Sequence, residues 1–220
     1  MSLELYEMEH SPYCIPIAQA LVALGKPYES KIVPNWDRSE VIRLTDGRYY
    51  QVPLLVHEGR AIYESSPNSI DIARYVDEAF GEGRLFPDRI EGMHEIAIEF
   101  IENELELATF KLVDPHYVDT IEDVADRMHT IRHKERRFGV GCVEDWRSRK
   151  TELRGDADRL LGRFEAILSR REFLFGEAPV FADFALFGII GNLTYRGFNE
   201  LSSDQEALAS WTERLAAFRY

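Results

Sequence analysis

The first 80 residues contain short apolar runs of strand type separated by amphipathic stretches with helical spacing. Alternation or short runs of apolar residues indicate strands, and apolar residues three or four positions apart indicate helices. The predicted strands cover residues 3–8, 28–33, 52–56 and 61–63, and the predicted helices cover 15–25, 37–44 and 72–79. The predicted order of elements is therefore βαβαββα.

The strand pattern ends at residues 81–87, which contain two glycines and a proline. After this break, apolar residues recur every three or four positions over 93–112, which predicts a long helix that ends at Asp114-Pro115. Similar stripes cover 118–138 and 157–168, and 180–191 is apolar nearly all round, as in a central buried helix. We therefore divide the chain into a domain over 1–80, a linker over 81–89 and an all-helical domain over 90–220.

Composition and charge exclude several classes of protein. The chain has 39 acidic and 26 basic residues and a formal charge of −13, so it would repel the phosphates of nucleic acid. Its longest apolar stretch is shorter than the roughly 20 residues of a membrane-spanning helix. The start of the chain lacks the pattern of a secretion signal, so we expect a cytoplasmic protein. The two cysteines, Cys14 and Cys142, are too few for a disulfide framework or a four-cysteine zinc site.

Three short motifs in the first domain point to one family. Ser11-Pro12-Tyr13-Cys14 follows the first predicted strand, Val52-Pro53 opens the third, and Glu64-Ser65 precedes the third helix. With the βαβαββα order and the helical second half, this pattern resembles the glutathione transferase superfamily over the whole chain. The resemblance implies an α/β + all-α fold, in which a thioredoxin-like domain precedes an all-helical domain. It also implies glutathione as co-substrate, a small electrophilic second substrate and a homodimer.

The resemblance implies a role for each binding motif. Val52, ahead of a cis-Pro53, would pair its backbone with the cysteinyl unit of glutathione. Glu64 would accept hydrogen bonds from the ligand ammonium, and Ser65 at a helix N-terminus would hold its α-carboxylate. An extra turn centred on residues 66–69 departs from the family pattern. The binding serine is therefore either Ser65 or Ser66.

A second departure concerns the apolar helix near residue 180. Ala182-Asp183-Phe184-Ala185 is similar to the family's buried capping motif, but the capping position holds Val180. We expect the Asp183 carboxylate to accept from the backbone at the helix start, and the missing half of the box to cost about 1 kcal/mol.

The chemistry requires the thiol of glutathione, with a pKa of about 8.5, to ionise near neutral pH. Ser11 stands where glutaredoxins carry their nucleophilic cysteine, at a helix N-terminus that favours an anion, and is the leading donor to the thiolate. The first alternative is an omega-like thiol transferase in which Cys14 forms a mixed disulfide with glutathione. The second is a non-enzymatic interaction protein on the same fold.

Other residues receive weaker assignments. The resemblance places a second-substrate site between the domains, with Tyr13, Phe110 and Tyr117 as candidate walls. His10 receives no role. The basic segment 127–150 is either a solvated, salt-bridged surface or a patch that attracts anions. The glutamates of the long helix are interpreted as surface charge; these are Glu99, Glu102, Glu104 and Glu106.

Overall fold

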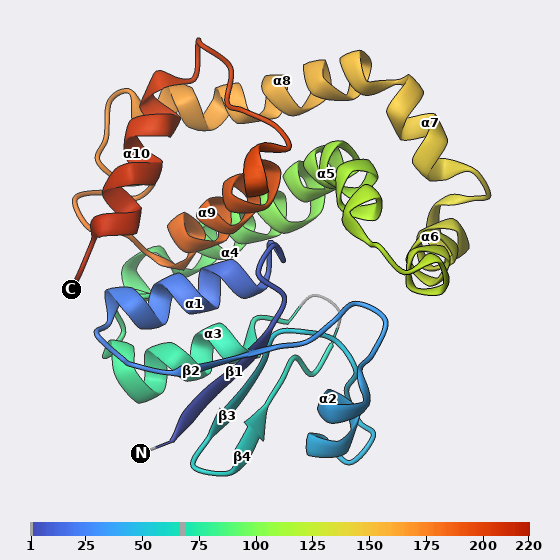
Figure 1. Ribbon diagram of the computed structural model, residues 1–220. Coiled ribbons are helices and arrows are strands. Elements are labelled where there is room, and N and C mark those ends of the chain that lie inside the picture. Colours follow the sequence, from blue (N-terminus) through green and yellow to red (C-terminus); the bar gives the residue numbers. More distant parts are fainter. Residues whose placement is uncertain (1, 67–68) are drawn as a thin grey trace.

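A four-stranded mixed sheet forms the centre of the first domain in the computed structural model, which describes residues 2–66 and 69–220 (Figure 1). The strands are β1 (Leu3–Glu7), β2 (Glu29–Ile32), β3 (Leu54–His57) and β4 (Arg60–Ile62), in the order β2-β1-β3-β4. Strand β1 pairs parallel to β2 and antiparallel to β3, and β4 is antiparallel to β3. This arrangement confirms the predicted order of the strands and the α/β class of this domain.

Helices cover both faces of the sheet. They are α1 (Cys14–Ala23), α2 (Ser39–Leu44) and α3 (Asp71–Val76), the last continued by a π-helical turn over Asp77–Gly81. Leu5 and Leu55 belong to the core that α1 and α3 complete, whereas Tyr6 and Leu54 pack with Val41 of α2 on the other face. The alternation of side chains along each strand therefore separates two apolar layers.

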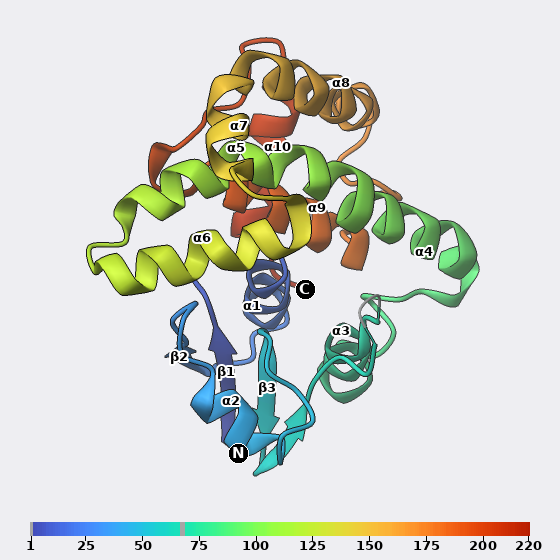
Figure 2. The same ribbon diagram turned by 90° about the vertical axis from the view of Figure 1, so that its right-hand side faces the viewer.

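The second domain consists of helices that lie above the sheet and α1 in Figures 1 and 2. They are α4 (Glu91–Glu99), α5 (Glu106–Thr120), α6 (Val124–Phe138), α7 (Cys142–Ser148), α8 (Lys150–Leu168), α9 (Phe181–Leu193) and α10 (Glu206–Ala217), with a π-helical segment over Phe100–Leu105 and short 3₁₀ turns over Asp88–Ile90 and Tyr195–Gly197. None of these helices, in the described ranges, is long and apolar enough to cross a membrane. The α/β plus all-α fold is confirmed, while the boundaries at residues 80 and 90 stay a prediction.

The prediction that Asp114-Pro115 ends the long helix is wrong. Helix α5 continues through Pro115 to Thr120. Proline removes one N–H from the helix ladder, but Val113 and Val118 on either side are buried at 1% and 2% exposure. Packing of this apolar face outweighs the local cost of the proline.

Helix α9 is the central buried helix that the apolar pattern predicted. Asp183 in its first turn is fully buried, and its carboxylate accepts from Val180 N at 3.1 Å, which confirms the expected half of the capping box. The same carboxylate accepts from Leu174 N at 2.9 Å and from Trp211 Nε1 at 3.3 Å. Burial raises the pKa of Asp183 to about 7, against the effect of these hydrogen bonds. One side chain thus joins α9, the preceding loop and α10.

We expect Asp183→Ala to lower the free energy of unfolding by about 3 kcal/mol, because three buried donors lose their acceptor. Asp183→Asn keeps one acceptor oxygen and is expected to lose about half as much. Urea unfolding followed by circular dichroism measures both. Asp204→Ala, at an exposed position, is the control, and equal stability of the two alanine variants would contradict the role of Asp183.

Candidate functional site

The turn between β1 and α1 is organised by Ser11, which is 8% exposed. Its N–H donates to Met8 O at 2.9 Å, and its Oγ accepts from Tyr13 N and Cys14 N, both at 3.3 Å. The hydroxyl therefore caps the start of α1, and these two bonds leave its own proton available for donation. An anion placed here would meet a hydroxyl donor and the positive end of the helix.

Helix α9 holds this turn in place from the other domain. A Cβ at Gly188 would lie 2.3 Å from Pro12 O and 2.6 Å from the Pro16 ring, so only glycine permits this approach. Asn192 of the same helix donates its Nδ2 to His10 O at 2.5 Å. The position of the reactive turn thus depends on the packing of the helical domain.

The Val52-Pro53 peptide bond is cis and lies directly before β3. Because β3 pairs with β1, with Leu54 opposite Tyr6, the cis-proline lies beside the strand that leads into the Ser11 turn. The structure therefore brings together two motifs that are about 40 residues apart in the sequence.

Glu64 lies at the start of α3, where its carboxylate caps the helix. It accepts from Asp71 N at 2.7 Å, from Ile72 N at 3.4 Å and from the Ser69 hydroxyl at 2.8 Å. Burial raises the pKa of Glu64, while these hydrogen bonds lower it. Glu64 is thus a half-buried carboxylate at a helix N-terminus.

The prediction that Ser65 lies at a helix N-terminus is wrong. Ser65 and Ser66 are exposed in a bend, and α3 begins only at Asp71, whose Oδ2 accepts from Ser65 N at 2.7 Å. Residues 67 and 68, the centre of the expected extra turn, lie outside the described residues. The serine nearest the helix start is Ser69, which the sequence reasoning missed although it stands just before the apolar run of α3.

Arg38 is a further residue that the sequence reasoning missed. Its Nη2 donates to Met8 Sδ and to Asn35 Oδ1, both at 3.1 Å, while its buried Nη1 has no hydrogen-bond partner among the described residues. Burial is the main cause that lowers its pKa, and the Cys14 and Tyr117 side chains lie close enough to oppose that effect. A cation without a carboxylate partner therefore lies near the Ser11 turn. Nothing in its local sequence marks it, because the neighbours come from three separate segments.

The helical domain adds Tyr117 to this region. The Tyr117 ring stacks on His10 with centroids 4.0 Å apart. Burial, helped by the positive charges of Lys134 and Arg196, lowers the pKa of His10 to about 4, so this imidazole is neutral at physiological pH. Helix α6 crosses above the loop that follows β2 (Figure 2), where Asn35 Nδ2 donates to Thr130 Oγ1 at 3.4 Å.

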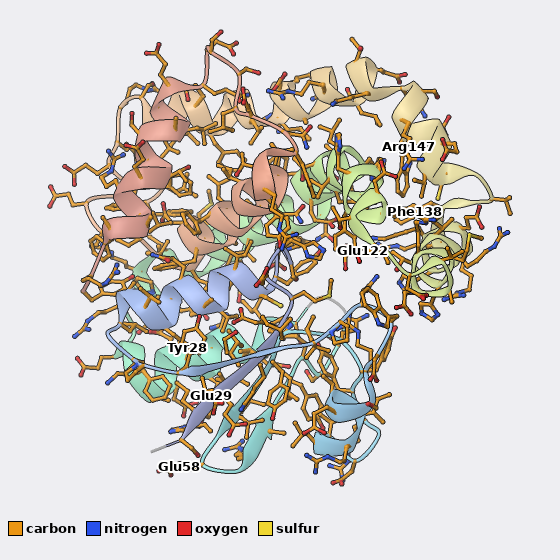
Figure 3. The ribbon with its side chains drawn as sticks, in the orientation of Figure 1. Tyr28, Glu29, Glu58, Glu122, Phe138 and Arg147 are labelled. Atoms are coloured by element: carbon orange, nitrogen blue, oxygen red, sulfur yellow. The ribbon has the colours of Figure 1, made fainter. Side chains whose placement is uncertain are left out.

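Phe110, predicted as a wall of the second-substrate site, belongs instead to the core of the helical domain. Its ring packs 5.1 Å from Phe138 and 5.3 Å from Trp146, and it is 6% exposed. Figure 3 labels Phe138 at the outer end of this domain. Sequence spacing predicted a helix at Phe110 but could not identify the aromatic side chains that pack around its ring.

Part of the basic segment 127–150 is a salt-bridged surface. Arg147 pairs with Asp119 at 2.6 Å and also with Glu144, and Arg149 pairs with Asp145 and Glu152 at 3.1 and 2.7 Å. Lys134 pairs with Asp114 at 2.5 Å, and its positive charge also lowers the pKa of His10.

Glu102 and Glu106 are half-buried and do not form the plain surface charge that the sequence suggested. Burial raises the pKa of each to about 7, and the Glu64 charge adds to this effect at Glu102. Both glutamates also raise the pKa of Tyr13, which is 39% exposed, although burial is the larger cause. Glu102 thus interacts through its charge with Glu64 and with Tyr13. The helix that carries the pair includes the π-helical segment, which shifts the faces expected from regular spacing.

Two family models match the chain. The glutathione S-transferase N-terminal domain matches residues 5–84, and the glutathione S-transferase C-terminal domain matches residues 125–218. The chain belongs to the glutathione transferase superfamily. No curated protein sequence matches this chain significantly.

Solved structures share this transferase fold at low sequence identity. Glutathione transferase GSTFuA3 from Phanerochaete chrysosporium is 16% identical, with a TM-score of 0.81 over 100% of this chain and 98% of that one. A glutathione S-transferase from Ceriporiopsis subvermispora in complex with glutathione is 19% identical, with a TM-score of 0.76 over 99% and 94%. Glutaredoxin 2 from Salmonella typhimurium in complex with glutathione is 21% identical, with a TM-score of 0.75 over 98% and 93%. At these low identities the three similarities show a shared fold.

Cys14 is fully buried in this transferase-family chain, on the inner side of α1. Burial raises the pKa of its thiol to about 12, although the Ser11 side chain lowers it. A thiolate is the reactive form of cysteine, so the folded chain holds this thiol in an inert state near neutral pH.

We expect Cys14 in the Cys142→Ala variant to react with Ellman's reagent at least about a hundredfold more slowly in the native protein than in urea. Ser148→Cys in the same background supplies an exposed reference thiol on α7. Absorbance of the released thionitrobenzoate gives both rates. Rapid native reaction of Cys14 would mean that the thiol is accessible.

Proposed function

We propose that this protein binds reduced glutathione and activates it as a thiolate that attacks a small electrophilic molecule. The observation that carries the proposal is the Ser11 turn. It joins the Ser11 hydroxyl, the N-terminus of α1 and, nearby, the Arg38 guanidinium, whose buried Nη1 has no hydrogen-bond partner among the described residues. All three stabilise negative charge at one place.

The remaining motifs suit the other parts of the tripeptide. Val52 precedes the cis-Pro53 and the strand that pairs with β1, and an extended cysteinyl unit would pair with its backbone. The Glu64 carboxylate would accept from the α-ammonium, since an ionised acceptor strengthens such a bond. We assign the α-carboxylate of glutathione to one of three serines near α3, which are Ser65, Ser66 and Ser69. The two similar structures that contain glutathione support glutathione as the ligand.

The proposed reaction begins when the thiol of glutathione ionises. The thiol proton leaves to solvent, and the thiolate accepts a hydrogen bond from Ser11 Oγ while Arg38 adds positive potential. The sulfur electron pair then forms a bond to an electrophilic carbon of the second substrate, as its leaving group departs or its double bond accepts the electrons. Tyr13 and Tyr117 are the proposed walls that hold this substrate. Its identity is left to a substrate screen.

The alternative in which Cys14 forms a mixed disulfide with glutathione finds support in the fold shared with Salmonella glutaredoxin 2. The full burial and raised thiol pKa of Cys14 favour the Ser11 chemistry instead. A non-enzymatic interaction protein is the other alternative, and it would have no affinity for glutathione. The homodimer that the resemblance implies and the cytoplasmic location expected from the sequence remain predictions.

We expect Ser11→Ala to raise the pKa of bound glutathione thiol by about 1–2 units toward its free value, because the thiolate loses its nearest donor. Arg38→Gln is expected to raise it by a smaller amount. The thiolate absorbance of saturated complexes, recorded against pH, measures this pKa. Ser148→Ala is the matched control on an exposed helix. An unchanged pKa in Ser11→Ala would remove Ser11 from the mechanism.

We expect Glu64→Gln to weaken glutathione binding about 10–100-fold, because a hydrogen bond between charged groups contributes about 1.5–3 kcal/mol. The amide oxygen can still accept from the α3 backbone, so the fold should survive. Calorimetric titration with reduced glutathione gives the dissociation constants, and Glu58→Gln in the exposed β3–β4 turn is the control (Figure 3).

The same titration with Ser65→Ala, Ser66→Ala and Ser69→Ala identifies the serine that holds the carboxylate. The variant with the largest loss marks that residue. Absence of binding by the unmodified protein at millimolar glutathione would overturn the proposed function and favour the interaction protein.

A further inference from the structure

A cavity of about 320 Å³ lies beside β2, at the edge of the sheet. Strand β1 separates β2 from β3, so this cavity is on the opposite side of β1 from Pro53. Its apolar walls include Ala18 and Val22 of α1 and Phe187 of α9. The cavity is therefore distinct from the region proposed to bind glutathione.

Glu7 breaks the apolar pattern of β1 and lines this cavity. Leu3, Leu5 and Glu7 share the face of β1 that packs under α1, and Glu7 is only 7% exposed. Its Oε1 accepts from Ser30 Oγ at 2.6 Å, and no other hydrogen bond or ion pair involves its carboxylate within the described ranges. Burial raises the pKa of Glu7. A buried carboxylate without a cation is costly to the fold, and such local conflicts mark functional sites.

The strand register explains why the protein does not neutralise Glu7 itself. In the parallel β1–β2 pair, Ser30 and Ile32 lie opposite Leu5 and Glu7 and share their face. Lys31 lies opposite Tyr6, so it projects from the other face, where it pairs with Glu29. The nearest lysine along the strand therefore cannot reach the carboxylate.

The other polar groups of the cavity are mainly hydrogen-bond acceptors. Gln19 donates its Nε2 to Leu215 O and Ala216 O at 3.0 and 3.2 Å, which leaves its Oε1 as an acceptor. Glu9 adds a second carboxylate, already engaged by Tyr195 OH at 2.9 Å and Arg196 at 3.7 Å. Among the described residues that line the cavity there is no Lys, Arg or His. Tyr28 lies at the base of this region, beneath α1 (Figure 3).

We propose that this cavity binds a small organic ammonium ion. The ammonium group donates to the Glu7 carboxylate and to Gln19 Oε1, and a short alkyl or aryl group packs against Val22 and Phe187. Desolvation of the cation is compensated because the carboxylate it meets is already buried. The apolar walls supply the rest of the binding energy. A neutral or anionic molecule of the same shape would leave Glu7 without its partner.

The test uses the whole chain and benzylammonium as the probe. Backbone amide NMR is followed during a titration to about 20 mM at constant ionic strength, a range that covers the affinity of a small ligand with one charged contact. We expect saturable shifts at Gln19, Ser30 and Phe187. Benzyl alcohol and benzoate, which have a similar shape, are expected to bind at least about tenfold more weakly.

Two variants locate the site. Glu7→Gln removes the charge at constant shape and is expected to weaken benzylammonium binding at least about tenfold. Ala18→Phe fills the cavity from α1, leaves Glu7 in place and should abolish binding, which keeps the test decisive if Glu7→Gln does not fold. The control Glu29→Gln changes an exposed glutamate on the opposite face of β2 (Figure 3). Equal binding of benzyl alcohol, full affinity in either cavity variant, or no saturable shifts would overturn the proposal.

Discussion

The close approach of α9 to the start of α1 is the contact on which the rest of the molecule depends. Gly188 leaves room for the Pro12 carbonyl, and Asn192 binds the backbone of His10. Asp183, in the first turn of the same helix, anchors that helix to the preceding loop and to α10. A change in the packing of the helical domain would therefore move Ser11, although Ser11 belongs to the other domain. The two domains behave as one unit at this place.

Two basic side chains lie near the Ser11 turn, although the chain as a whole is acidic. Arg38 has a buried nitrogen without a partner, and Lys134 raises the potential at His10. On the side of α3 the sign changes again, because Glu64 lies near Glu102. In the proposed function, the anionic sulfur would meet positive charge near Arg38, and the ligand ammonium would meet negative charge near Glu64. Net charge is a property of the whole chain and says nothing about this local pattern.

Strand β1 and helix α1 contribute to two separate regions. Their connecting turn forms the proposed glutathione site, while Glu7 and the outer side of α1 form the cavity beside β2. Within the part of the chain that the structure describes, each region contains a charged side chain without a partner of opposite sign: Arg38 in the first and Glu7 in the second. A buried charge without a partner reduces the stability of the fold. An anionic ligand would suit Arg38, and a cationic ligand would suit Glu7.

The fold class was readable from the amino-acid pattern, because apolar periodicity records which side of each element is buried. The Ser11 turn, the Val52-Pro53 pair and Glu64 are short motifs within local elements, so the family resemblance could point to them as candidate site residues. Three local expectations differ from the structure: α5 continues through Pro115, α3 begins after Ser65, and Phe110 is buried in the core. In each case long-range packing outweighs the local preference. Arg38, Ser69, Glu102 and Glu7 acquired their surroundings only in the tertiary structure. Burial and charge proximity depend on residues distant in the chain, so no local pattern encodes them.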